Sequence, residues 1–196
     1  LEGEFLLPEN NVASTEKEYA MLREMLAGKP ISSADRHCIA KRLVKSVSDQ
    51  EKIRKAIQIT EKTYQYILEH IRPGMYEYEV EAMIAYQFRL QRGVEAFPSI
   101  VASGPSACTL HYTDHDRKIE AHDLVLIDFG IELDGYGADI SRTFPVSGQF
   151  TPRQQEIYDV VQDAKKYAES MLKPGISRKN WNLAVKEYMF QVCQQL

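Results

Sequence analysis

The sequence has 196 residues, of which 44% are hydrophobic and 27% are charged, values typical of a globular chain with a sizeable core. Its formal net charge of −4 argues against a nucleic-acid-binding surface, which needs a basic stripe. No apolar run approaches the roughly 20 residues that a membrane span requires. The three cysteines lack CxxC spacing and are expected to be buried free thiols in a reducing, cytoplasmic compartment.

The first half of the chain predicts helices. The run "TEKEYAMLREMLAGKP" (15–30) favours a helix that stops at its Gly and Pro residues. Ser48 and Glu51 have the spacing of a capping box, which predicts the start of a long helix. Its apolar face is predicted to be Ile53, Ile57, Thr60, Tyr64, Ile67 and Ile71.

A second helix is predicted from about Tyr76 to Arg92, after the "RPG" sequence that ends the first. Gly93 is its expected stop. Its inward residues are predicted to be Val80, Met83, Ile84 and Phe88.

The hydrophobic period then changes from that of helices to that of strands. The runs "SIVASG" (99–104), "DLVLIDFGIEL" (123–133) and "YGADISRTFPV" (136–146) are short, apolar and rich in β-branched residues. Asp134-Gly135 is a favoured pair for a two-residue hairpin turn. These runs predict an antiparallel hairpin in which residue n pairs with residue 269 minus n.

The helical pattern returns after this hairpin. Thr151 and Gln154 form a second capping box, and Pro152 occupies a position tolerated in a first helical turn. The pairs Pro73-Gly74 and Pro174-Gly175 each close a long helix and open a shorter one, which indicates an internal duplication. The second copy lacks strands before Leu196, so the natural protein is expected to be longer by roughly the ~50 residues of another strand unit.

Two aspartates stand in the predicted hairpin, although Asp is depleted in strands. Asp128 would face Ser141 across the hairpin. Asp139 lies two positions before Ser141, so its side chain should be on the same face of the strand as that of Ser141. Both carboxylates should therefore point from one face of the hairpin. Their Cβ atoms would lie roughly 7–8 Å apart. A single such Asp would be read as a hydrogen-bond acceptor or a partner of Arg142, but two on one apolar face favour a pair of divalent cations.

The histidines are weighed in the same way. His111 ends a run of small residues, "ASGPSACTL", and is either a packed histidine or a site residue. His115, among Asp114, Asp116 and Arg117, is predicted to be a solvated turn residue. The "DFG" sequence does not indicate a protein kinase, because the other kinase motifs are missing.

The segments "LHYT", "LVLIDFG" and "DGYGADISRTFPVSG", with two aspartates eleven apart, resemble the pita-bread metallopeptidases, above all the Xaa-Pro aminopeptidase and Xaa-Pro dipeptidase group. The resemblance implies an α+β pita-bread fold over residues 42–196. Residues 42–150 would form its first half and 151–196 an incomplete second half. Residues 1–41 would be the tail of a smaller N-terminal domain and its linker.

The resemblance also implies roles for three residues. Asp128 would chelate one metal ion, Asp139 would bridge two, and His111 would hydrogen-bond the peptide. The ions would be two divalent cations, most often Mn²⁺ and sometimes Co²⁺ or Zn²⁺. The substrate would be a peptide with proline in the second position, and the protein would be a homo-oligomer. A histidine and two glutamates of the family's metal shell would lie beyond Leu196.

Two classes of function follow. The first is a metallopeptidase that releases the N-terminal residue before proline, with an Xaa-Pro dipeptidase as the alternative. The second is a pita-bread relative that has lost its chemistry and acts as a binding module. The aspartate pair favours the enzyme, but the 196-residue chain by itself is expected to be inactive, since two aspartates alone are a poor site for two ions.

Overall fold

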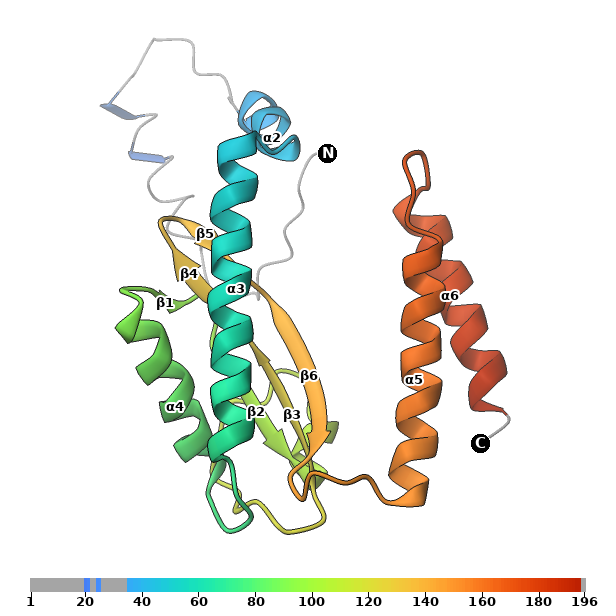
Figure 1. The fold of residues 1–196 in the computed structure, drawn as a ribbon. Coiled ribbons are helices and arrows are strands. Elements are labelled where there is room, and N and C mark those ends of the chain that lie inside the picture. The colour runs from blue at the N-terminus through green and yellow to red at the C-terminus, as the bar shows by residue number, and fades with distance from the viewer. Residues whose placement is uncertain (1–19, 22–23, 26–34, 195–196) are drawn as a thin grey trace. The chain divides into compact units, whose positions relative to one another are not determined.

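The computed structural model describes residues 20–21, 24–25 and 35–194 (Figure 1). Contacts divide the chain into Leu1–Ser46 and Val47–Leu196. The first unit contains helix α2 (Asp35–Leu43). The helix predicted for residues 15–30 lies mostly outside the described residues, so it stays a prediction. All of the candidate site residues belong to the second unit.

Helix α3 (Val47–His70) opens the second unit and buries a line of mostly small residues. Ile57, predicted to face inward, is 36% exposed. Thr60, predicted to lie on the inner face, is fully buried, and its Oγ1 accepts a 3.2 Å hydrogen bond from Ile131 N. Ser48 lies inside the helix, so its predicted capping role is wrong. The buried residues are Ala56, Thr60, Thr63 and Ile67, followed by Ile71 just beyond the helix.

Helix α4 (Glu77–Leu90) is confirmed. Val80, Ile84 and Phe88 are fully buried, as predicted, because they recur along one face of the helix. Gly93 takes part in ending this helix, as expected, since its N–H donates to Phe88 O over 3.0 Å. A Cβ at this position would lie 2.4 Å from Ile131 Cδ1, so glycine permits a close approach.

Within the described part of the chain, the strands form two antiparallel three-stranded sheets, in the orders β2-β3-β6 and β1-β4-β5. Their register confirms the predicted hairpin, since Asp128 pairs with Ser141 and Leu133 with Tyr136. Asp134 and Gly135 both have positive φ, as a type I′ turn requires. The strands are β1 (Val94–Glu95), β2 (Ile100–Ser103), β3 (Leu124–Phe129), β4 (Ile131–Leu133), β5 (Tyr136–Gly137) and β6 (Ile140–Pro145).

The main core lies between the strands and the two helices α3 and α4, which pack on one face of the strands (Figure 1). In β3 the side chains alternate: Val125, Ile127 and Phe129 are fully buried in this core. Leu126 and Asp128 therefore point to the opposite face, since successive strand residues alternate. The β3 alternation thus places a carboxylate on the face away from the helices.

Helices α5 (Pro152–Ser170) and α6 (Arg178–Cys193) form a helical hairpin. The predicted capping box is confirmed: Gln154 N donates to Thr151 Oγ1 over 3.3 Å, and Thr151 N donates to Gln154 Oε1 over 2.9 Å. The predicted duplication has a structural counterpart in the two helix pairs. Gly74 follows α3 with φ +96°, and Gly175 follows α5 with φ +92°.

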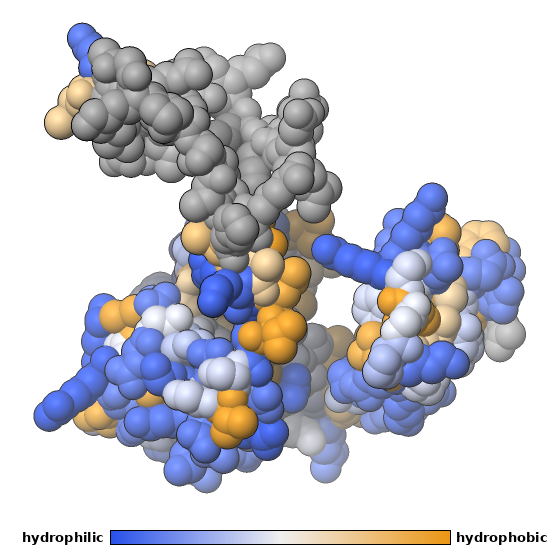
Figure 2. Space-filling view, turned by 90° about the horizontal axis from the view of Figure 1, so that it is seen from above, coloured by the Kyte–Doolittle hydropathy of each residue, from blue (hydrophilic) through white to orange (hydrophobic). Residues whose placement is uncertain are grey.

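The three cysteines are free, as predicted, but all are exposed, so their predicted burial is wrong. Among the described residues, no helix is long and apolar enough to cross a membrane. In the space-filling view, hydrophobic residues are scattered among hydrophilic ones (Figure 2).

Candidate functional site

Asp128 is a half-buried residue near the end of β3. Its cross-strand partner is Ser141, whose Oγ donates a 2.8 Å hydrogen bond to Asp128 Oδ1. This bond fixes one carboxylate oxygen and leaves the other to interact elsewhere.

Asp139 lies outside the strands, in the gap between β5 and β6, so its predicted position inside a strand is wrong. The gap faces Gly130, where β3 gives way to β4. A Cβ at Gly130 would lie only 1.7 Å from Ala138 O. The backbone at Gly130 and the backbone at Ala138 therefore approach too closely here for a regular ladder. The register nevertheless continues across the gap, because Ala138 N donates to Ile131 O over 2.9 Å.

Both aspartates line one cavity of about 350 Å³, together with His111. The three predicted site residues thus come from a strand, a strand gap and a loop, and meet at one place. The shared face predicted from strand parity therefore agrees with the structure. The rest of the lining is mainly apolar and consists of Phe97, Pro98, Ile100 and Thr113.

The two carboxylates interact unfavourably when both are charged. The pKa of Asp139 is raised above its ordinary value, first by partial burial, then by the negative charge of Asp128, and then by a hydrogen bond with Asp128. A shared proton or a bound cation would relieve this repulsion. Carboxylate oxygens are ligands suited to Mg²⁺, Mn²⁺ and Ca²⁺, so the pair fits a divalent ion in kind.

The aspartates alone do not make a complete metal shell. Among the described residues, no group of three or more His, Cys, Asp and Glu side chains is placed to hold a metal ion. A dinuclear centre at this cavity therefore requires donors in addition to Asp128 and Asp139.

His111 is exposed, and its backbone has the left-handed φ of +52°. It follows the short 3-10 helix η1 (Gly104–Cys108) in the connection between β2 and β3. Left-handed backbone is uncommon for residues other than glycine and tends to persist where the surroundings fix it. The structure thus places His111 on the wall of the cavity rather than in the packed core.

His115 was predicted to be a solvated turn residue, and this prediction is wrong. The side chain is half-buried, and its Nε2 accepts a 3.3 Å hydrogen bond from Val101 N. Its carbonyl oxygen accepts from Tyr78 N over 2.9 Å. The neighbouring charged residues concealed this role in the sequence, since they suggested exposure.

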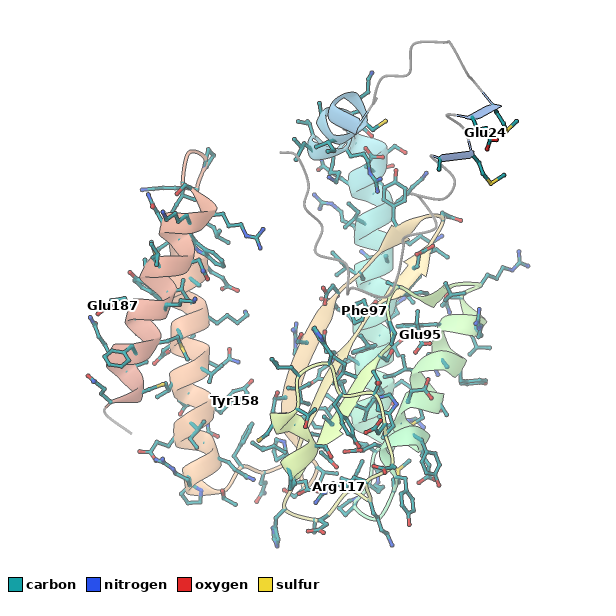
Figure 3. All side chains as sticks on the ribbon, turned by 180° about the vertical axis from the view of Figure 1, so that it is seen from behind. Glu24, Glu95, Phe97, Arg117, Tyr158 and Glu187 are labelled. Carbon is teal, nitrogen blue, oxygen red and sulfur yellow. The ribbon has the colours of Figure 1, made fainter. Side chains whose placement is uncertain are left out.

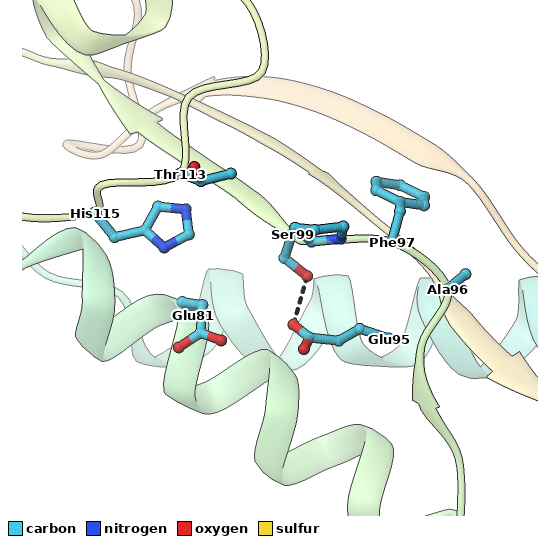
Figure 4. Close-up of a pocket in the computed structure, with 8 residues that line it drawn as sticks. Glu81, Glu95, Ala96, Phe97, Ser99, Thr113 and His115 are labelled. Carbon is cyan, nitrogen blue, oxygen red and sulfur yellow. Dashed lines mark hydrogen bonds between the residues drawn. The ribbon is translucent and has the colours of Figure 1, made fainter. Parts of the chain in front are cut away.

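A second cavity of about 610 Å³ adjoins the first and shares Phe97, Pro98 and Thr113 with it (Figure 4). The carboxylates of Glu81 and Glu95 and the ring of His115 border it. Ser99 Oγ donates a 2.8 Å hydrogen bond to Glu95 Oε1 there, which occupies one carboxylate oxygen.

A further residue of the site region was missed in the sequence. Glu77 is fully buried, and it contacts the loop that carries His111. A signal was present: Glu77 precedes Val80, Ile84 and Phe88 at intervals of three and four, so it belongs to the buried face of α4. A helical pattern built from apolar residues alone gives a glutamate no weight, so it does not identify Glu77 as buried.

Comparisons with known proteins identify the family. Residues 51–192 match the model described as "Metallopeptidase family M24". The Xaa-Pro aminopeptidase of Haemophilus influenzae is 44% identical over 144 residues, which are 72% of this chain and 33% of that protein. The Xaa-Pro dipeptidase of Pyrococcus furiosus is 36% identical over 148 residues, which are 74% of this chain and 42% of that protein. The chain thus spans between a third and a half of these relatives' lengths.

A solved structure of an Escherichia coli aminopeptidase P variant in complex with substrate has a TM-score of 0.76 to this chain, with 38% identity. The match covers 80% of this chain and 36% of that one. The predicted α+β pita-bread fold is confirmed by this likeness. The chain belongs to metallopeptidase family M24, whose members use divalent metal ions, and it is related there to Xaa-Pro aminopeptidases and Xaa-Pro dipeptidases.

Proposed function

We propose that the whole protein is a metal-dependent aminopeptidase that removes the N-terminal residue from peptides with proline in the second position. The observation that carries this proposal is the meeting of Asp128, Asp139 and His111 on one cavity of about 350 Å³. The likeness to Xaa-Pro aminopeptidases supports the choice of substrate.

The two aspartates would hold two divalent ions, with Mn²⁺ as our first choice and Co²⁺ or Zn²⁺ as alternatives. Asp128 would chelate one ion and Asp139 would bridge both, and the Ser141 hydroxyl, which donates to Asp128 Oδ1 over 2.8 Å, would orient the first carboxylate. Such ions, when bound, supply an activated water nucleophile and polarise the scissile carbonyl group. Their positive charge would also relieve the repulsion between the two carboxylates.

His111 would act on the peptide rather than on the metal. It lies on the wall of the same cavity and is exposed there, so its imidazole can hydrogen-bond a bound peptide group. Phe97, Pro98 and Ile100 give this cavity an apolar lining that favours an apolar side chain or a proline ring. These residues would orient the peptide against the metal pair.

The metal-binding part of the proposal is tested by titrating Mn²⁺ into the 196-residue chain by calorimetry. We expect weak binding that is lost in Asp139→Asn. The matched control is Asp134→Asn, which removes the same charge from the hairpin turn, where an Asn-Gly pair is equally favoured. Equal Mn²⁺ affinity in both variants would rule out the aspartate pair as the site.

The catalytic part is tested on the whole protein with added Mn²⁺. We expect release of the first residue from a peptide beginning Ala-Pro, and none from the same peptide beginning Ala-Ala. Asp139→Asn should abolish the release, whereas Asp134→Asn should leave it intact. Mn²⁺ binding without hydrolysis would instead favour the non-catalytic binding module.

A second candidate is an Xaa-Pro dipeptidase, which the 36% identity to the Pyrococcus furiosus enzyme favours. The two activities differ in substrate length: a dipeptidase would cleave Ala-Pro, and an aminopeptidase would cleave longer Ala-Pro peptides. Comparing both substrates at one protein concentration decides between them. The domain boundaries, the homo-oligomer and the cytoplasmic location stay predictions.

A further inference from the structure

The carboxylate of Glu77 is buried in the first turn of α4 and accepts four hydrogen bonds. Oε1 accepts from Ser103 N at 2.6 Å and from Ser103 Oγ at 2.7 Å. Oε2 accepts from the Tyr112 hydroxyl at 2.7 Å and from Arg117 N at 3.2 Å. A buried carboxylate in a structural role normally has such partners, and here they lie at the end of β2 and in the connection that follows it.

These partners flank or lie within the loop of residues 104–116, which is the first part of the connection between β2 and β3. Ser103 is the last residue of β2, Tyr112 directly follows His111, and Arg117 directly follows the loop. The helix start adds two backbone bonds: Glu77 N donates to Arg117 O over 3.0 Å, and Tyr78 N donates to His115 O over 2.9 Å. The first turn of α4 therefore contacts the residues on both sides of this loop and, within it, Tyr112 and His115.

A second layer of contacts surrounds Glu77. Arg117 Nη1 donates to Ser103 Oγ over 2.7 Å, and the Arg117 guanidinium also pairs with Asp123. These cationic contacts offset the cost of burying negative charge beside Tyr112 and Ser103. Figure 3 labels Arg117 in this part of the molecule.

The backbone of His111 shows what the network restrains. Its φ of +52° is strained for a histidine, and its own side chain is exposed. The adjacent Tyr112 is only 9% exposed and is held by Glu77. The restraint on Tyr112 thus opposes relaxation of the strained residue next to it.

We propose that Glu77 is a positioning residue whose buried carboxylate fixes the loop of residues 104–116 and thereby holds His111 at the wall of the Asp128–Asp139 cavity. The importance of that position rests on the proposed function, in which His111 contacts the peptide. The carboxylate itself does not line the cavity and touches no reacting group.

The negative charge matters because all four contacts come from donors. A glutamine at position 77 has the same shape but presents one NH₂ group where an oxygen now accepts. In one orientation the NH₂ group would face Ser103 N, and in the other it would face Arg117 N, so a backbone N–H loses its acceptor either way. The Tyr112 hydroxyl keeps Asp116 Oδ1 as a second acceptor, at 3.1 Å. Glu77→Gln should therefore loosen the loop without changing the volume of the core.

The test is amide hydrogen exchange on the metal-free 196-residue chain, with Glu77→Gln against Glu79→Gln. Glu79 is the matched control, since it is in the same helical turn and its carboxylate accepts only from Tyr76 N, at 2.6 Å. We expect exchange in residues 104–116 to rise by roughly tenfold in Glu77→Gln alone, the effect of one lost buried bond. The ring ¹H–¹⁵N signals of His111 should move in Glu77→Gln and stay in place in Glu79→Gln.

Tyr112→Phe is the second variant, for the case in which Glu77→Gln does not fold. It removes only the hydroxyl, which lies 2.7 Å from Glu77 Oε2 and 3.1 Å from Asp116 Oδ1, and it should move the same His111 signals. Combining the two substitutions should add little, because they break one shared contact.

The proposal is overturned if neither variant changes exchange in residues 104–116, or if exchange rises uniformly along the chain. Unmoved His111 signals would also overturn it. No metal or peptide enters this measurement. If the chain passes this test and the whole protein with added Mn²⁺ cleaves no Ala-Pro peptide, the proposed function is rejected and the role of Glu77 stands.

Discussion

Ser141 and Asp128 face each other across β6 and β3, and the serine hydroxyl donates to one oxygen of the carboxylate over 2.8 Å. The hydroxyl selects a carboxylate rotamer before any ion arrives. Partners of this kind affect metal affinity although they do not touch the metal.

Ser141→Ala should weaken Mn²⁺ binding by about tenfold, because the Asp128 carboxylate loses its orientation. Calorimetric titration measures the change. Ser147→Ala is the control, since that hydroxyl donates only to Gln149 O, in the turn after β6. Unchanged affinity in Ser141→Ala would mean that Asp128 does not bind the ion.

Asp139→Asn should raise the melting temperature of the metal-free protein at pH 7. The folded-state pKa of Asp139 is raised, mainly by burial and then by the charge of Asp128. Stability from this group is therefore present below its unfolded-state pKa and is lost as the pH rises through the folded-state pKa. The variant escapes this loss because it carries no charge.

The pH dependence of the difference provides the check. Melting curves in chelator should show the advantage of Asp139→Asn at pH 7 and its disappearance below about pH 3.8, the ordinary pKa of the group. Asp134→Asn should show no comparable advantage. In saturating Mn²⁺ the wild type should have the higher melting temperature of the two proteins, since a bound ion stabilises the wild type by mass action.

Gly130→Ala should strongly destabilise the fold. Its Cβ would lie 1.7 Å from Ala138 O, and backbone cannot move as a flexible side chain can. We expect a loss in the free energy of unfolding of about 3 kcal/mol or more, at the upper end of the overpacking range. Urea denaturation measures it.

Gly137→Ala is the control for this clash. The added Cβ would meet only Ala96 Cβ, at 3.2 Å, and a shift of a few tenths of an ångström relieves that contact. A Gly130→Ala protein as stable as this control would contradict the close approach of the two strands.

Phe88→Ala should cost about 3–5 kcal/mol, the usual range for a fully buried phenylalanine. The ring packs against Phe129 with centroids 6.0 Å apart, so the substitution leaves a void between α4 and β3. Leu90→Ala, at a position 57% exposed on the same helix, should change stability by less than about 0.5 kcal/mol. Similar losses in both variants would place the core elsewhere.

The sequence predicted the hairpin to the residue because two signals agreed. Asp134-Gly135 specifies a tight turn, and the β-branched runs on both sides extend equally from it. Burial of α3 was harder to predict, since Ala56 and Thr63 also belong to its inner face and a hydrophobicity pattern gives these small residues little weight. Long-range partners explain the rest: His115 is held by Val101, fourteen positions earlier, and no local pattern reports such a contact.

The candidate site was predictable in part for a related reason. Asp128 and Asp139 stood out because carboxylates are unexpected in apolar runs, and the pairing rule brought them to one side. Glu77 did not stand out, because a glutamate in the first turn of a helix is ordinary. Its function depends on Ser103 and Tyr112, which are 26 and 35 positions away.

The hairpin register gives the interval between the two aspartates a mechanical meaning. The eleven positions are the residues from Asp128 to the turn and from the turn back to Asp139. The two carboxylates stay side by side only if the number of residues in each of these two arms is unchanged. One residue inserted into either arm would rotate one carboxylate to the opposite side and leave the other in place. A symmetric extension of both arms at the tip would lengthen the ribbon and preserve the pair. The tip is therefore free to vary in length by whole residue pairs, whereas each arm between its aspartate and the turn cannot change alone.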